Sequence, residues 1–272
     1  MGNNKKIIHY ILFLLTLGST IYCGTKFCGG NIIGGILYSV TIMSILLVHE
    51  MGHYINAKKN GMEVTLPYFI PLPFWLGTMG AVIQIKSKIP NRNALIETGA
   101  SGPLYGFIAS VVAIVVGMLI SPVSTQPVSG FLGTSLLYKS LAYLVKGVHP
   151  CYIVLNPVLF AGWLGLFVTM INLLPIGQLD GGHVIYALFG KSKLYATGMN
   201  YFFKAFIVAG FVCLFLFQSP TWLFFGVLVY FLHAGNVVHP PLTNEITDLT
   251  LWNKVKGWAC IIIFILTFMP KP

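Results

Sequence analysis

The sequence predicts an all-α polytopic membrane protein, and its composition supplies the first reason. Of the 272 residues only 22 are charged, 16 Lys or Arg and 6 Asp or Glu, which is 8% of the chain. Soluble domains carry roughly 25% charged residues, which they need to cover their surface. Apolar residues make up 56% and aromatic residues 14% of the chain, so a disordered protein is excluded as well. The apolar residues also gather in runs of membrane-spanning length.

A helix needs about 20 apolar residues to cross a bilayer, and by this measure the chain contains six to seven transmembrane helices. The segments are 7–23, 31–57, 94–120, 151–174, 194–217, 221–239 and 255–269. The first follows Lys5 and Lys6 as in a signal peptide, but no small-residue cleavage site comes after it, so we expect a retained helix. Neither a repeat nor a linker interrupts the chain, which predicts one membrane-embedded domain over residues 1–272.

The stretch between the second and third spans, residues 64–89, is apolar but irregular. Pro67, Pro71 and Pro73 cannot lie inside a spanning helix, and residues 81–85 have the composition of a short β-strand. Irregular backbone at membrane depth is tolerated only where protein buries it or where it lines a wet cavity. We therefore expect a short re-entrant β-hairpin or loop beside a cavity.

The basic residues are distributed unevenly between the two sides of the predicted spans. With a cytoplasmic N-terminus, 11 basic residues fall inside, 4 fall outside and Lys204 falls within a span. The inside residues are Lys5, Lys6, Lys58, Lys59, Lys86, Lys88, Arg92, Lys191, Lys193, Lys254 and Lys256. Cytoplasmic loops of membrane proteins are enriched in Lys and Arg, so this orientation is the predicted one. The net charge of +10 is thereby explained by topology and does not indicate nucleic-acid binding.

The second span contains the motif His49-Glu50-Met51-Gly52-His53. Positions i and i+4 of a helix lie on one face, so both imidazoles can bind one metal ion. The glutamate beside the first histidine can take a proton from water held at the metal, which is the arrangement of zinc hydrolases. Chance would produce about 0.003 copies of such a motif in this composition. The structural alternative is a set of polar side chains satisfied by neighbouring helices, at a high cost inside a membrane.

A third ligand is expected among the remaining acidic residues. Asp180 follows the fourth span, which must end at Pro175, and this span runs in the same direction as the second. Asp180 therefore reaches the same membrane face as His49 and His53. The alternatives are that Asp180 caps the following helix, or that His183 replaces it as ligand. The other acids lie in connecting segments where we expect solvated charges: Glu63, Glu97, Glu245 and Asp248.

Two further sets of residues carry open interpretations. The remaining histidines lack a partner at metal-binding spacing and are expected to be hydrogen-bonded or interfacial: His9, His149, His233 and His239. Gly99, Gly102 and Gly106 are spaced for close packing of helices. The alternative for these glycines is contact with a substrate that passes between helices.

These motifs together resemble the site-2 protease family of intramembrane zinc metalloproteases. The first motif matches the family's HExxH helix, and Asn172 through Gly181 matches its N-x-x-P-x-x-x-L-D-G motif. Residues 99–103, Gly-Ala-Ser-Gly-Pro, are similar to the family's small-residue segment, and residues 67–73 with Gly80-Ala81 are similar to a stretch of some bacterial and chloroplast members. The match covers about residues 31–185, the expected catalytic core.

The resemblance implies a role for each matching residue. His49, His53 and Asp180 would bind one Zn2+, Glu50 would be the general base, and Asn172, with Gly102 as a second candidate, would contact substrate. The hairpin would hold an unwound substrate by strand addition. The substrates would be transmembrane proteins, cut in or near their membrane segments within the lipid bilayer, in regulated proteolysis.

The resemblance also bears on domains and location. The 121–150 segment is too short for a PDZ domain, and three residues after Met269 leave no room for a nucleotide-sensing domain. We expect an active site toward the cytoplasmic face of a prokaryotic plasma membrane. The alternative functions are a metal or proton transporter that uses the same cluster, and a zinc-binding scaffold without catalysis.

Overall fold

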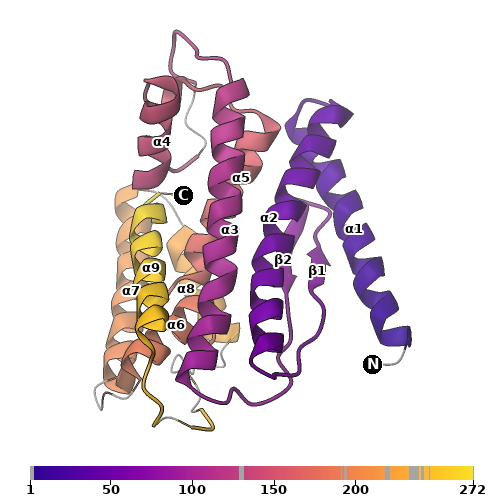
Figure 1. Ribbon diagram of the computed structural model, residues 1–272. Helices are drawn as coiled ribbons and strands as arrows, with labels where there is room; N and C mark the ends of the chain where they lie inside the picture. Colours follow the sequence, from indigo (N-terminus) through magenta and orange to yellow (C-terminus); the bar gives the residue numbers. More distant parts are fainter. Residues whose placement is uncertain are drawn as a thin grey trace.

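The computed structural model describes residues 3–128, 132–190, 192, 195–217, 221–232, 239, 242–244 and 246–271. Long helices run side by side over most of this part of the chain, as Figure 1 shows. The helices are α1 (Asn3–Phe27), α2 (Ile32–Lys59), α3 (Arg92–Ile120), α4 (Leu136–Lys146), α5 (Pro157–Asn172), α6 (Asp180–Phe189), α7 (Tyr195–Phe217), α8 (Thr221–Leu232) and α9 (Leu251–Thr267). The strands are β1 (Tyr68–Pro71) and β2 (Thr78–Val82). The predominantly helical fold class is thus confirmed.

Four of the described helices, α1, α2, α3 and α7, are long and apolar enough to cross a membrane. The helix α5 is apolar but has 16 residues, because Asn156 caps it and Pro157 occupies its first turn. The predicted span 151–174 is therefore too long at its start, where residues 150–152 form a 3-10 turn instead. Of the predicted span 221–239, residues 233–238 lie outside the described part of the chain.

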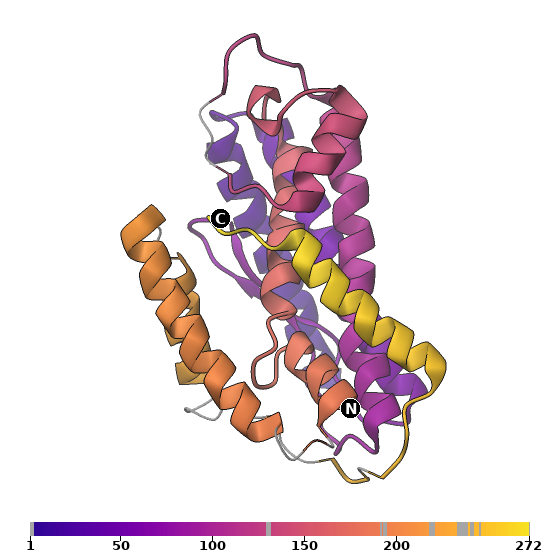
Figure 2. The ribbon, with the colours of Figure 1, turned by 90° about the vertical axis from the view of Figure 1, so that its left-hand side faces the viewer.

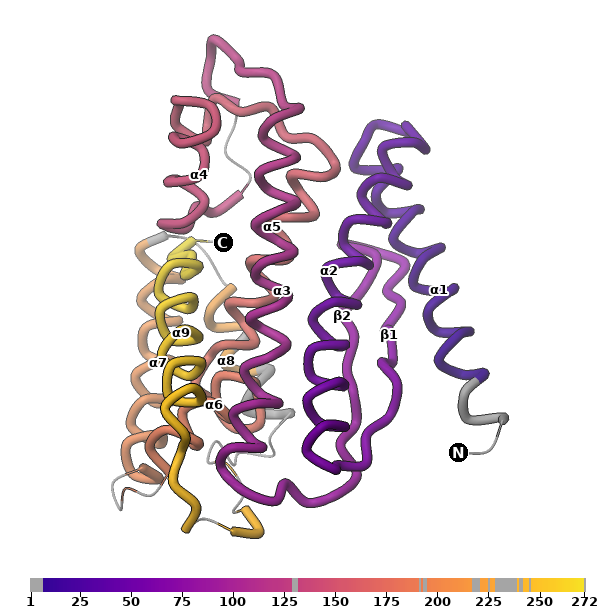
Figure 3. The backbone as a smooth tube through the Cα atoms, viewed as in Figure 1, coloured from indigo at the N-terminus to yellow at the C-terminus, as the bar shows by residue number. Residues whose placement is uncertain are grey.

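The predicted hairpin is present as an antiparallel pair of strands between α1 and α2 (Figure 1). Tyr68 lies opposite Val82, and a separate bridge between Val64 and Ile85 prolongs the pairing. The strand expected at 81–85 lies earlier, at Thr78–Val82. The tube in Figure 3 follows the chain from α2 through this hairpin to the start of α3.

Three hydrogen bonds fix the hairpin to the helices on either side of it. The His9 Nδ1 lies 3.1 Å from the carbonyl oxygen of Pro67, near the base of the hairpin. Close to the tip, Ser19 Oγ donates to the Gly77 carbonyl at 2.6 Å, and Tyr38 Oη donates to the Leu76 carbonyl at 2.8 Å. The hairpin is thus held along its length by α1 and α2.

The central helices α2, α3 and α5 pack with their backbones close together. A Cβ atom on Gly52 of α2 would lie 2.8 Å from the Ser101 carbonyl oxygen of α3. A Cβ atom on Gly162 of α5 would lie 2.8 Å from the backbone nitrogen of Ile114. Small residues permit such close contacts between helices in membranes. The apolar core around these helices includes fully buried Ile42, Ile114, Leu159 and Leu166.

The structure corrects two expectations about connecting segments. The 121–150 segment contains the helix α4, which Ser135 caps at its start and Gly147, at φ +70°, ends. Glu97 is not a solvated loop acid, because it lies on α3. Its carboxylate accepts hydrogen bonds from Asn60 Nδ2 at 3.0 Å and from Asn253 Nδ2 at 3.1 Å, which tie α2 and α9 to α3.

The helices α7 and α8 form an antiparallel pair on one flank of the molecule, as Figure 2 shows. Trp222 of α8 joins this pair to the body of the molecule. Its Nε1 donates to the Pro270 carbonyl at 3.0 Å, and its ring stacks on Phe268 with centroids 5.2 Å apart.

Candidate metal centre

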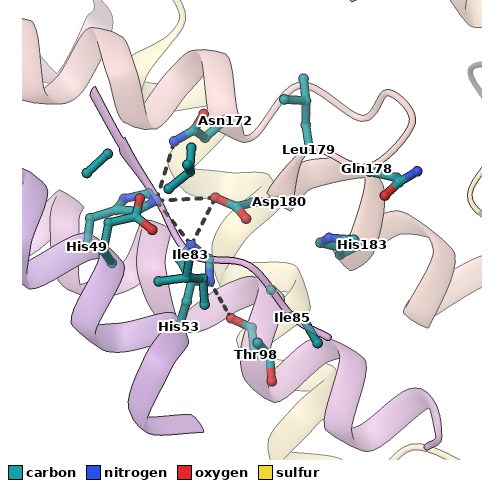
Figure 4. Close-up of a pocket in the computed structure, with 14 residues that line it drawn as sticks. His49, His53, Ile83, Ile85, Thr98, Asn172, Gln178, Leu179, Asp180 and His183 are labelled. Atoms are coloured by element: carbon teal, nitrogen blue, oxygen red, sulfur yellow. Dashed lines mark hydrogen bonds and ion pairs between the residues drawn. The ribbon is translucent and has the colours of Figure 1, made fainter. Parts of the chain in front are cut away.

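Three predicted ligands converge on one point between α2 and the start of α6. The Nε2 atoms of His49 and His53 lie 3.1 Å apart, and Asp180 Oδ2 lies 3.3 Å from each. Figure 4 shows the three side chains pointing toward one another. Both histidines are buried, and no other group of three such ligands occurs among the described residues.

These distances fit a tetrahedral zinc site. Zinc binds its ligands at about 2.0–2.1 Å, so two ligand atoms of a tetrahedral ion are about 3.3 Å apart. The His53 Nδ1 lies 2.7 Å from the Thr98 carbonyl oxygen and must carry the proton, since that oxygen can only accept. A neutral His53 then presents the lone pair of Nε2 to the same point as Asp180 Oδ2. These acceptor atoms could together hold a metal ion, and three protein ligands would leave a fourth position for water.

A tight turn after α5 places the third ligand. The helix ends at Asn172, and the turn that follows contains Pro175 and Gly177, which has φ +55°. Side chains at Gly181 or Gly182 would overlap backbone carbonyl groups of this turn, so only glycine lets α6 begin so close to α5. Asp180 is the first residue of α6, and the capping position belongs to Leu179. The Asp180 carboxylate is therefore turned to the histidines.

The small residues of α3 form the surface against which the imidazoles lie. A Cβ atom on Gly102 would overlap the His53 ring, and one on Gly106 would lie 2.7 Å from His49 Nδ1. Gly102 is thus placed against a predicted metal ligand, and this contact favours the packing interpretation.

The candidate base and the ligands share one cavity of about 230 Å³. Glu50 is 5% exposed, and its carboxylate interacts with the backbone amide of Ile83 in the segment after β2. Asn172 also lines the cavity, with its Nδ2 atom 3.3 Å from His49 Nε2. The other lining residues are Ala81, Val82, Ile85, Thr98, Gly99, Gln178, Leu179 and His183. A base, three ligands and an amide thus face the same space.

The segment after β2 presents one backbone edge to this cavity. Gln84 and Lys86 hydrogen-bond through their backbones to the segment 63–65, at N···O distances of 3.0 and 2.8 Å. Successive residues of an extended chain direct their backbone groups to opposite sides, so Ile85 directs its N–H and C=O away from that segment. Because Ile83 and Ile85 line the cavity, a strand edge borders the site.

The structure also places the remaining predicted histidines. His183 lies outside the ligand cluster, with its Nδ1 atom 2.7 Å from His239 Nε2. His9 and His149 are hydrogen-bonded as expected, while His233 lies outside the described residues.

Sequence reasoning missed two backbone groups of the site, the Thr98 carbonyl and the Ile83 amide. A proline-rich irregular stretch close to a metal motif was the available signal for the second. That stretch does not identify the individual backbone groups, because every residue supplies a carbonyl and nearly every residue an amide.

A buried His-Glu-x-x-His helix with a third carboxylate, set between helices of membrane-spanning length, defines a membrane-embedded metallohydrolase centre. The sequence profile of peptidase family M50 matches residues 37–217. The chain belongs to peptidase family M50, and the resemblance to site-2 proteases is confirmed.

Several named relatives are plant proteins. "Probable zinc metalloprotease EGY1, chloroplastic" of Arabidopsis thaliana is 29% identical over 97% of this chain and 53% of its own length. The protein of the same name from Oryza sativa subsp. japonica is 31% identical, over 84% of this chain and 39% of that protein. The chain thus spans about half or less of the length of these relatives. "Site-2 Protease from Methanocaldococcus jannaschii" shares 20% identity at a TM-score of 0.44, over 89% of this chain and 92% of that one.

The relatives bear on two earlier expectations. They are named zinc metalloproteases, which together with the ligand cluster assigns zinc as the cofactor. They give no support to the transporter alternative. They are also named as chloroplast proteins, so the predicted prokaryotic plasma membrane receives no support from them.

Proposed function

We propose that this chain is an intramembrane zinc metalloprotease that hydrolyses peptide bonds in or near transmembrane segments of membrane proteins, in regulated proteolysis. The carrying observation is the meeting of three ligand atoms at zinc spacing with the Glu50 carboxylate in one cavity. Membership of a peptidase family supports the same reaction.

Glu50 is the general base of the proposed reaction. Zinc, when bound, polarises the scissile carbonyl and lowers the pKa of water toward about 7. Glu50 takes a proton from the attacking water and returns it to the leaving amine. Its position one residue after His49, beside the Ile83 amide, supports this role because the carboxylate is buried next to the predicted ligands.

The substrate is proposed to bind as an extended strand along the edge formed by Ile83 and Ile85. A helix keeps its peptide groups in internal hydrogen bonds, so a transmembrane segment must unwind before it can be cut. Strand addition gives the unwound backbone new hydrogen-bond partners. We propose that Asn172 positions the substrate, because its side chain lines the cavity beside His49. Gly102 is not among the described lining residues, and its contact with His53 favours packing as its role.

We propose a cytoplasmic N-terminus and an active site toward the cytoplasmic face. The C-terminal end of α2 and the N-terminal ends of α3 and α9 lie at one end of the molecule (Figure 1). These ends carry Lys58, Lys59, Lys254 and Lys256, which supports the positive-inside orientation. The residues that line the catalytic cavity lie within residues 31–185, which supports a single catalytic core over that range.

Glu50→Gln tests the mechanism, with Glu63→Gln as the control because Glu63 is an exposed acid outside the cavity. Both variants are expected to retain one zinc per chain, measured by elemental analysis of the purified protein. In membranes, the Glu50→Gln protein should leave single-span proteins uncut that the wild type and the control cleave. Full cleavage by Glu50→Gln would contradict the proposal.

A further inference from the structure

A second cavity adjoins the catalytic one. Its volume is about 900 Å³, and it shares Ile83, Ile85, Gln178 and His183 with the catalytic cavity. We call it the vestibule. Its other lining residues are Gln84, Ser87, Lys88, Ile89, His239, Leu242 and Thr243. A chain that leaves the catalytic centre along the strand edge therefore enters this space.

Two segments form adjacent parts of the vestibule wall, and backbone hydrogen bonds join them. One is the continuation of β2, residues 83–89, and the other includes Leu242–Asn244. The backbone nitrogen of Thr243 donates to the Ile89 carbonyl at 3.3 Å, and that of Asn244 donates to the Pro90 carbonyl at 3.0 Å. These bonds fix the wall in position.

Buried aromatic contacts fix the same wall at His239. Its Nε2 lies 2.7 Å from His183 Nδ1, and its ring stacks on Tyr186 with centroids 4.5 Å apart. The residue is 5% exposed. The vestibule is therefore a built part of the fold, attached to the helix that carries Asp180.

The vestibule differs from the catalytic cavity in charge. The catalytic cavity contains the carboxylates of Glu50 and Asp180. Among the described residues that line the vestibule there is no carboxylate, while Lys88 contributes an ammonium group and several amides and hydroxyls contribute hydrogen-bond donors. The Lys88 ammonium group would attract a substrate carboxylate in the vestibule.

The spacing along the wall defines where a carboxylate would bind. Ile83 lies beside the base, and Lys88 follows five residues later. An extended chain rises about 3.3 Å per residue and Ser87 forms a bend, so the two positions are at most about 16 Å apart. A substrate strand that runs along this edge therefore meets Lys88 with a residue no more than about five positions from the scissile bond.

We propose that the vestibule is a substrate subsite that selects Asp or Glu within about five residues of the scissile bond, on one side of it. The inference rests on the proposed proteolytic function and adds a substrate class to it: membrane proteins with an acidic, extended segment next to the cut transmembrane part.

The test uses the full chain, purified in detergent with zinc, and a library of unstructured polypeptides of random sequence as the probe. Such polypeptides need no unwinding, so mass spectrometry of the cut sites reports the subsites directly. The wild type should enrich Asp and Glu at least threefold at one or more of about five positions on one side of the scissile bond. Lys88→Gln should abolish the enrichment, and Lys88→Glu should replace it with enrichment of Lys and Arg.

Lys254→Glu is the matched control, because it makes the same change of charge on an exposed residue of α9 outside the vestibule. It should keep the wild-type preference. Cleavage by the wild type without acidic enrichment, or an unchanged preference in Lys88→Glu with full zinc content, would overturn the vestibule proposal and leave the protease intact. Absence of any cleavage that depends on Glu50 would instead remove the proposed function and the subsite with it.

Discussion

The contact of α2 with α3 and the α7–α8 pair illustrate two ways of holding membrane helices together. Half of the apolar stretch of α2 is buried, against 17% for α7. Where α2 meets α3, glycines bring one backbone or imidazole directly against the other. In the α7–α8 pair the packing is less uniform: a Cβ atom on Gly210 of α7 would lie 3.1 Å from the Leu223 backbone of α8, whereas one on Gly198 of α7 would have no atom within 4 Å. The first contact holds the imidazoles of two predicted ligands in place, whereas α7 and α8 carry none of the predicted ligands.

The largest effect is expected from Gly102→Ala. The added methyl group occupies the space of the His53 ring, so the imidazole must leave its position beside Asp180. We expect at least a tenfold loss of zinc affinity, measured by titration with a competing chelator. Gly198→Ala is the control and should leave zinc binding unchanged, while it raises the free energy of unfolding by about 0.4–1 kcal/mol. Equal behaviour of the two variants would contradict the comparison.

Arg92→Gln tests whether the far end of α6 also matters for the site. The Arg92 guanidinium, buried at the start of α3, donates to the Ala187 and Leu188 carbonyl groups at the end of α6. Loss of these charged hydrogen bonds should lower the free energy of unfolding by about 1.5–3 kcal/mol. Because Asp180 begins the same helix, zinc should bind more weakly and excess zinc should raise the melting temperature. If excess zinc does not change the melting temperature of the Arg92→Gln variant, the end of α6 has no influence on the metal site.

Asn253→Ala tests a contact of the core that lies away from the metal. The Asn253 amide donates to Glu97 Oε1 at 3.1 Å and to Asn93 Oδ1 at 2.9 Å. Removal of the amide should cost about 1–2 kcal/mol of unfolding free energy, because two partners lose a hydrogen bond. Zinc content should stay at one per chain. Thermal unfolding and elemental analysis of the same sample check both statements, and a loss of zinc would show that α9 positions the ligands.

The smallest effect is expected from Trp222→Phe in the α7–α8 pair. Phenylalanine keeps a ring against Phe268 but loses the hydrogen bond to Pro270. The expected cost is about 1 kcal/mol, seen as a small fall in melting temperature, without a change in zinc affinity or cleavage rate. A large fall in cleavage at full zinc content would show that the flank acts on the site.

The sequence predicted those parts of the site that depend on distinctive side chains at short spacing. His49 and His53 follow from one helical turn, and Asp180 follows from the direction of two spans. The helix α4 was not predicted because only apolar stretches long enough to cross a bilayer were counted as helices, although Ser135 and Gly147 are recognisable cap residues. The position of β2 could not be predicted from composition, because glycine conformations and pairing partners decide it. Gly80, at φ +100°, lies inside the strand that composition placed after it.

The distance along the chain between the ligands has a consequence for the newly made protein. Asp180 follows His49 by 131 residues. At a synthesis rate of about 5–20 residues per second, the histidine pair exists for roughly 7–26 s before its third ligand has been made. During that interval Glu50 lies beside an incomplete set of predicted ligands. The helix with the histidine pair is therefore present in a newly made chain before the ligand cluster can be complete, and the cluster closes only after the turn beyond α5 has been made.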